Sequence, residues 1–204
     1  MSEIKLLQGD CLELMKNIPD KSIDLVLCDP PYGTTSCSWD SIIDLDELWN
    51  QYNRIIKDVG AIVLFDSEPF SSKVRISNIK KYKYDWIWEK SGASSCLSVK
   101  KMPLKVTENI MVFSSKKMNY YPIQKPVELL KYLIKTYTKE GDMVLDNCMG
   151  SGSTGVACKN LNRNFIGIEL DENYFNIAKQ RIENGFVQED VTDEKLNSLP
   201  LFLE

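Results

Sequence analysis

Residues 143–169 constrain the fold of this chain more than any other stretch. They run as an apolar strand, a glycine turn, a helix, a second apolar strand and a terminal acid. Gly150, Gly152 and Gly155 satisfy G-x-G-x-x-G, which allows a tight turn, close approach of a ligand to the backbone and packing of helix on strand. Glu169 ends the second strand, where a carboxylate can accept hydrogen bonds from ribose hydroxyls. The stretch predicts a site for an adenosine-containing cofactor, although Glu169 alone also fits a solvated strand-end acid.

Strands and helices alternate along the rest of the chain. Apolar runs predict strands at residues 4–7, 23–28, 61–65, 84–88, 109–113, from 143, and 165–168. Helical periodicity is found at residues 11–17, 45–57, 71–81, 127–137, 153–161 and 173–182. This alternation predicts an α/β domain over residues 1–184 with a mainly parallel, twisted sheet flanked by helices. Residues 185–204 hold five acids and one lysine and are expected to form an acidic tail.

Composition narrows the class of protein. A length of 204 residues suits one domain, and the apolar runs are too short to span a bilayer. The first ten residues lack the pattern of a secretory leader. Six cysteines are scattered without C-x-x-C, which favours free thiols in a reducing compartment, so we expect a cytoplasmic protein. The chain has no histidine, which excludes histidine triads and histidine metal sites, and we expect no metal.

The strand predicted at residues 23–28 is followed directly by Asp29-Pro30-Pro31-Tyr32. This could be only a strand-terminating turn with an aromatic neighbour. It also resembles the active-site tetrapeptide of the amino-group DNA methyltransferases, which methylate adenine N6 or cytosine N4. The resemblance makes all four residues catalytic candidates: Asp29 and the Pro30 carbonyl accept the two amine hydrogens, the prolines stiffen the backbone, and Tyr32 stacks on the base.

The order of the two motifs resembles the permuted, or beta, class of that family, because the tetrapeptide precedes the glycine turn. The likeness spans residues 7–182. Within this class the chain resembles small phage or mobile-element adenine methylases, which share D-P-P-Y-G-T-T followed by a Trp-Asp pair, here Trp39-Asp40. It implies a Rossmann-like methyltransferase fold that uses S-adenosylmethionine.

Residues of the family's cofactor site can be carried over by position. The resemblance implies cofactor contacts from Asp10, Cys11, Asp29, Gln124, Lys125, Pro126, Asp146, Cys148, Gly150, Ser151, Gly152, Ser153, Thr154, Glu169 and Leu170. Asp10 also fits a helix N-cap, and Pro126 a helix entry. The chain departs from the family where Tyr121 and Ile123 replace histidine and threonine. It also departs at residues 147–149, where Asn-Cys-Met stands in the family's D-P-F-x-G segment.

The formal net charge of −4 hides a basic stretch. Residues 73–105 contain nine Lys and Arg against two acids, interleaved with aromatics. Such a face can neutralise DNA phosphates, although charge runs are often only solvated surface. The DNA-contact candidates are Trp39, Lys90, Lys100, Lys101 and Lys105, with target recognition expected at about residues 91–120. Trp39 could equally anchor its loop to the core. The expected partner is double-stranded DNA, and a homodimer is one option for the assembly.

Together these features favour an S-adenosylmethionine-dependent DNA adenine N6-methyltransferase acting on a flipped adenine. An acid in the first tetrapeptide position favours adenine, and cytosine N4 is the alternative. Cytosine C5 chemistry is disfavoured, because its nucleophilic cysteine follows a proline and no cysteine here does. A nicotinamide-dependent oxidoreductase leaves the Asp-Pro-Pro-Tyr turn unexplained, and a non-catalytic DNA-binding module leaves the glycine turn unexplained.

Overall fold

The computed structural model describes residues 2–33, 41–94, 105–115 and 129–184. Its strands are β1 (Ile4–Gln8), β2 (Ile23–Cys28), β3 (Ile56–Asp66), β4 (Tyr82–Ser94), β5 (Lys105–Phe113), β6 (Met143–Asp146) and β7 (Asn164–Glu169). Its helices are α1 (Cys11–Met15), α2 (Leu45–Ile55), α3 (Phe70–Ser77), α4 (Leu129–Tyr137), α5 (Ser153–Asn160) and α6 (Glu172–Asn184). None of the helices in these ranges is long and apolar enough to cross a membrane.

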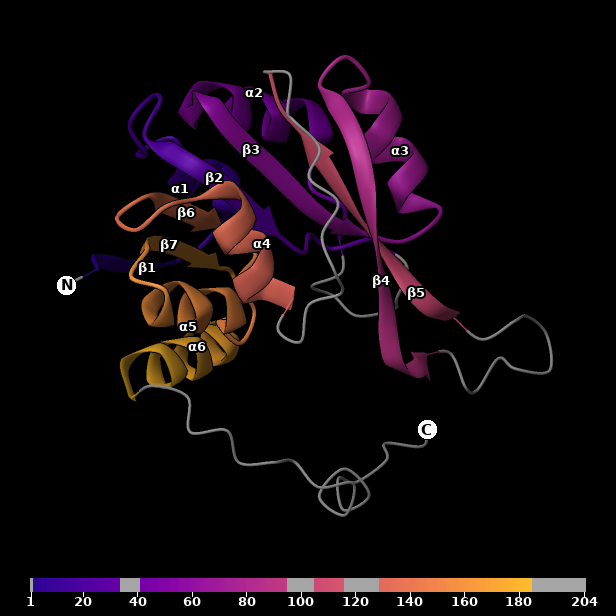
Figure 1. The fold of residues 1–204 in the computed structure, drawn as a ribbon. Helices are drawn as coiled ribbons and strands as arrows, with labels where there is room; N and C mark the ends of the chain where they lie inside the picture. The colour runs from indigo at the N-terminus through magenta and orange to yellow at the C-terminus, as the bar shows by residue number, and fades with distance from the viewer. Residues whose placement is uncertain (1, 34–40, 95–104, 116–128, 185–204) are drawn as a thin grey trace.

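All seven strands form one sheet, in the order β1-β7-β6-β2-β3-β5-β4 (Figure 1). The five strands from β1 to β3 in this order pair in parallel, and β5 is antiparallel to both of its neighbours. The mainly parallel α/β sheet is therefore confirmed. Parallel strands covered on both faces need nearly continuous apolar sequence, and β2 illustrates this with five buried residues in six.

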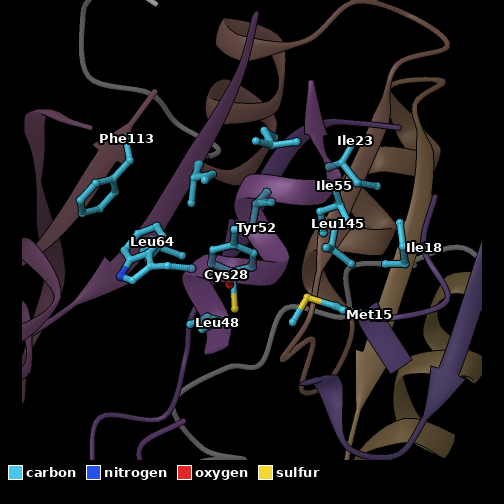
Figure 2. Close-up of a cluster of buried hydrophobic side chains, with 14 of the residues drawn as sticks. Met15, Ile18, Ile23, Cys28, Leu48, Tyr52, Ile55, Leu64, Phe113 and Leu145 are labelled. Atoms are coloured by element: carbon cyan, nitrogen blue, oxygen red, sulfur yellow. The ribbon is translucent and has the colours of Figure 1, made fainter. Parts of the chain in front are cut away.

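The helices cover the two faces of the sheet in sets of three. On one face α1, α2 and α3 pack over a buried cluster that includes Met15, Tyr52 and Phe70. On the other face α4, α5 and α6 cover a second cluster that includes Leu133 and Ala178. Figure 2 shows the first cluster, in which the ring of Tyr52 lies beside Cys28. The sheet is thus covered on both faces, which leaves the ends of its strands open to a ligand.

Several predicted boundaries were wrong. The helix predicted at 45–57 ends at Ile55, because the next residue, Ile56, already pairs with Ile23 and begins a longer β3. The helix predicted at 71–81 ends at Ser77, and residues 78–81 form a turn closed by a hydrogen bond from Lys81 N to Asn78 O. Strand β4 extends beyond both ends of its predicted run at 84–88, and β5 begins four residues before its predicted run at 109–113; the apolar pattern missed the added parts because they carry charged residues.

The sheet has a topological switch point between β6 and β2. The chain leaves β6 through α5 and returns as β7 on one side, whereas it leaves β2 through α2 and returns as β3 on the other. Strands β6 and β2 are direct neighbours. In open α/β sheets ligands bind outside the carboxyl ends of the strands at such a point. This is also where the sequence placed both of its motifs.

Candidate active site

A cleft of about 1670 Å³ opens at the carboxyl ends of β1, β2, β6 and β7. Its lining includes Asp10 after β1, Asp29 after β2, Asp146 at the end of β6 and Glu169 at the end of β7. The tetrapeptide, the glycine turn and the strand-end acid therefore face the same space. All described cofactor candidates except Gly152 line it, and Gly152 lies within the same turn.

The glycine turn connects β6 to α5, and two of its glycines have left-handed backbone. Gly150 has φ +51° and Gly152 has φ +81°, a region that favours glycine. No atom lies within 4 Å of the place where a Cβ of Gly150 would stand, so the backbone there is open to a ligand. A Cβ on Gly155 would instead collide with Ile182 and stand 2.7 Å from Phe165 Cε1. Its lack of a side chain lets α5 pack against β7, as the sequence predicted, and also against α6.

Glu169 is tied into the turn and is not a freely solvated acid. Its Oε2 accepts a 2.8 Å hydrogen bond from Gly150 N, and its Oε1 accepts one of 2.9 Å from Asp171 N. Each carboxylate oxygen has two lone pairs, so both can still accept hydrogen bonds from a ligand in the cleft. The side chain of the next residue, Leu170, is 61% exposed and lies on the cleft wall.

Asp10 caps α1, as one of its two interpretations anticipated. Its Oδ1 accepts a 3.1 Å hydrogen bond from Glu13 N. The cap fixes the start of the helix so that Cys11 also faces the cleft. Capping and ligand contact are compatible here, because a carboxylate has more acceptor sites than the single one used.

Asp29 and Tyr32 are coupled to each other. The Tyr32 hydroxyl donates a hydrogen bond to Asp29 Oδ1, and the Tyr32 ring stacks on Phe70 with centroids 5.3 Å apart. Asp29 is open to the cleft, yet the surrounding protein removes enough water to raise its pKa above the ordinary value. Burial, followed by the Asp29 charge, raises the pKa of Tyr32, so its hydroxyl keeps its proton and remains a donor.

Residues 147–149, which depart from the family pattern, are held in place by Tyr52, a partner that the sequence did not reveal. Asn147 Oδ1 accepts a buried 2.6 Å hydrogen bond from the Tyr52 hydroxyl, which reaches it from α2. Burial raises the pKa of the neighbouring Asp146 to about 7, and Cys148 N donates a 3.2 Å hydrogen bond to its Oδ1. Cys148 and Cys28 carry free thiols, as expected. An amide and a thiol thus replace the family's proline and phenylalanine on the floor of the cleft.

Some residues of the cleft were missed by sequence reasoning. Trp88 from β4 and Glu108 from β5 line it together with Asp29. Arg181 on α6 also lines it and donates a 2.8 Å hydrogen bond to Ser151 O. No motif marks these residues. The sequence of β4 did hold a signal for Trp88: side chains alternate between the two faces of a strand, so Trp86, Trp88 and Lys90 share one face.

The DNA-contact candidates are placed only in part. Lys90 forms an ion pair with Glu108 at the cleft, and within the same basic stretch Arg75 pairs with Asp85. Lys105 is the first residue of β5, and the description covers only its backbone. The other DNA-contact candidates, Trp39, Lys100 and Lys101, lie outside the described residues, and so do the cofactor candidates Gln124, Lys125 and Pro126. The interval 91–120 includes the outer end of β4 and all of β5, and its role in target recognition stays a prediction.

The family model described as DNA methylase, which covers N6 and N4 enzymes, matches residues 68–180, more than half of the chain. The chain belongs to this DNA methylase family. The order of its motifs agrees with the permuted class, because β2 with Asp29 precedes β6 and β7 with the glycine turn.

Individual proteins similar to this methylase include methyltransferases as well. Type II methyltransferase M.HpaI from Haemophilus parainfluenzae is 28% identical over 96% of this chain and 79% of its own length. The crystal structure of the M1.HpyAVI-SAM complex has a TM-score of 0.68 at 28% identity, covering 87% of this chain and 99% of that one. The cytosine-N4-specific PvuII DNA methyltransferase has a TM-score of 0.72 at 19% identity, covering 97% of this chain and 91% of that one, which shows a shared fold.

Proposed function

We propose that this DNA methylase is an adenine N6-methyltransferase that uses S-adenosylmethionine. The single observation that carries the proposal is that Asp29 and the glycine turn with Glu169 open into one cleft at the switch point. Membership of the family supports methyl transfer to DNA. The likeness to a solved SAM complex at 28% identity supports the methyl donor.

The residues of the cleft fit that donor. The open backbone at Gly150 leaves room beside the turn, and the carboxylate of Glu169 has acceptor sites left for ribose hydroxyls. The exposed side chain of Leu170 offers an apolar surface for the adenine ring. When bound, S-adenosylmethionine supplies a methyl group on a positively charged sulfur, which leaves as a neutral thioether once the methyl has moved.

The tetrapeptide would prepare the target amine. An amine conjugated to a base ring is a poor nucleophile, because its lone pair is delocalised into the ring. Asp29 Oδ1 already accepts from Tyr32, which leaves Oδ2 to accept one amine hydrogen, while the Pro30 carbonyl accepts the other. The raised pKa of Asp29 makes its carboxylate a better proton acceptor. Asp29 then takes the proton that the nitrogen releases as the methyl is transferred.

The base has to leave the duplex to reach this position, because its amine is paired inside the helix. The flipped base would enter between the tetrapeptide and the wall formed by Trp88 and Glu108. We propose double-stranded DNA as the substrate, with phosphate contacts from the lysines of the basic stretch. The acid at the first tetrapeptide position is the feature that favours adenine over cytosine.

Mass spectrometry of nucleosides identifies the product. Unmethylated plasmid DNA is incubated with the protein and isotopically labelled S-adenosylmethionine, then digested completely. We expect labelled N6-methyldeoxyadenosine. Labelled N4-methyldeoxycytidine would reassign the base while keeping the reaction class, and DNA without label, from protein that binds S-adenosylmethionine, would contradict the proposal.

A further inference from the structure

Strands β4 and β5 form a ribbon that runs past the end of β3 (Figure 1). The pairing of β3 with β5 ends at Asp66 and Asn109. The next β5 residue, Glu108, pairs with Trp88 of β4. Both side chains line the cleft together with Asp29. The ribbon therefore brings an acid and an aromatic to the wall of the space where the amine would be placed.

An ion pair is fixed on that wall. Lys90 Nζ contacts Glu108 Oε1, and the two side chains are only 21% and 19% exposed. The same ammonium lies 5.7 Å from the centroid of the Trp88 ring, a cation–π arrangement. A pair withdrawn from water this far adds little net stability, because desolvation offsets the attraction. Its position beside the proposed catalytic carboxylate suggests an electrostatic role.

Both members of the pair act on Asp29. Besides burial and the Tyr32 hydrogen bond, Glu108 raises the pKa of Asp29 and Lys90 lowers it. Several titratable and charged groups face this region among the described residues: Tyr32 of the tetrapeptide, Cys28 on β2, Lys90 on β4, Glu108 on β5, Asp66 on β3 and Asp146 on β6. Among these groups only Lys90 and Glu108 form a pair of opposite charges, so a single substitution can remove either charge and leave the other.

We propose that the Lys90–Glu108 pair is a positioning device for proton acceptance by Asp29, in which Glu108 holds the ammonium of Lys90 against Trp88 and away from the catalytic carboxylate. This rests on the proposed role of Asp29. An ammonium free to reach Asp29 would neutralise it and make it a weaker base for the amine proton. With the pair intact, Asp29 keeps both its charge and its free oxygen for the amine.

The test is the pH dependence of the single-turnover rate on plasmid DNA. Lys90→Met removes the positive charge and should move the acid limb of the profile to higher pH. Glu108→Gln removes the negative charge and frees the ammonium, so it should move that limb to lower pH. Each shift should be roughly 0.5 to 1 pH unit, or about 3- to 10-fold in rate on the limb. The double variant should return close to the wild-type position.

A second ion pair on β4 is the matched control. Arg75 Nη2 and Asp85 Oδ2 are 2.8 Å apart, with side chains 26% and 24% exposed. Asp85 lies on the face of β4 opposite to Lys90, where Arg75 reaches it from α3. Asp85→Asn should change the melting temperature without moving the acid limb. Lys90→Arg keeps the charge and should leave the limb near the wild-type position. Asp146 sits on β6, separated from β5 by two strands, so its titration should be alike in all variants.

The experiment distinguishes a failure of the ion-pair proposal from a failure of the proposed function of Asp29. If the two single variants fold, bind S-adenosylmethionine and keep the wild-type acid limb, the pair has no such role and the proposal is overturned. If they shift the limb in the same direction, the charge argument is also overturned. Asp29→Asn is measured in parallel: undiminished methyl transfer by that variant would remove the proposed function of Asp29 itself, independently of the pair.

Discussion

The hydroxyl of Tyr52 donates a 2.6 Å hydrogen bond to Asn147 Oδ1, joining α2 to the turn that follows β6. Tyr52 is fully buried and Asn147 is 2% exposed. The bond lies directly under the cleft. It explains how an asparagine is accommodated where the family has a proline: a buried amide oxygen is tolerated because a specific donor meets it.

Tyr52→Phe should therefore destabilise the protein. The change removes one donor and leaves the amide oxygen of Asn147 buried without it, which costs about 1–3 kcal/mol. Urea unfolding of the two proteins measures the difference. Tyr132→Phe is the control, because within the described residues the buried Tyr132 hydroxyl has no hydrogen-bond partner. Its removal should be neutral or slightly stabilising, and equal losses from both variants would contradict the assignment.

The burial of Asp66 should make the stability of the fold depend on pH. It is fully buried, and neither carboxylate oxygen has a partner among the described residues. Burial raises its pKa to about 6. Between about pH 4 and pH 6 the Asp66 carboxyl is ionised in the unfolded state but still protonated in the folded state. This group therefore lowers the free energy of unfolding as pH rises through that window, and the penalty is constant above it.

Asp66→Asn should remove this penalty. We expect similar stability to wild type near pH 4 and a gain on the order of 1–3 kcal/mol at pH 7 to 8. Denaturant melts at the two pH values give the result. Asp58→Asn, at a side chain that is 85% exposed, should change stability by less than about 0.5 kcal/mol at either pH. A gain from Asp66→Asn that is the same at both pH values would show that ionisation is not its cause.

Glu169→Ala should weaken S-adenosylmethionine binding. The substitution removes the proposed ribose contact and also the acceptor of Gly150 N, which orders the turn. Lost hydrogen bonds to a charged group predict a loss of about 1–3 kcal/mol in binding free energy. Titration calorimetry measures it, with Glu172→Ala, an acid of the first turn of α6, as a comparison. Unchanged affinity in Glu169→Ala would move the ribose contact to another residue.

Much of the fold could be predicted because its signals are local. The apolar run before Asp29 and the glycine turn of residues 150–155 each specify an element and its end by residue type alone. The Glu169 carboxylate could be placed near the turn because parallel strands end at the same edge of the sheet.

What the sequence could not reveal depends on pairings between distant segments. The contact of Tyr52 with Asn147 joins residues 95 positions apart, and a tyrosine in an amphipathic helix carries no sign of its partner. Glu108 and Trp88 reach the cleft only because β5 and β4 continue beyond β3, which is a matter of strand register. The burial of Asp66, without a hydrogen-bond partner among the described residues, likewise depends on tertiary packing at the end of β3, since acids at strand ends are mostly solvated.

The measurement that tests the account most directly is methyl transfer to DNA by Asp29→Ala, made together with its affinity for S-adenosylmethionine. In the proposed mechanism Asp29 receives the target amine, whereas Glu169 and the glycine turn hold the methyl donor, so the variant should bind the donor nearly as well as wild type. Its transfer rate should fall by roughly 100-fold or more, the scale for removing a positioned polar group at a reaction centre. A wild-type rate of methyl transfer by the folded variant would contradict the account, because the proposed mechanism gives the amine proton to Asp29 alone.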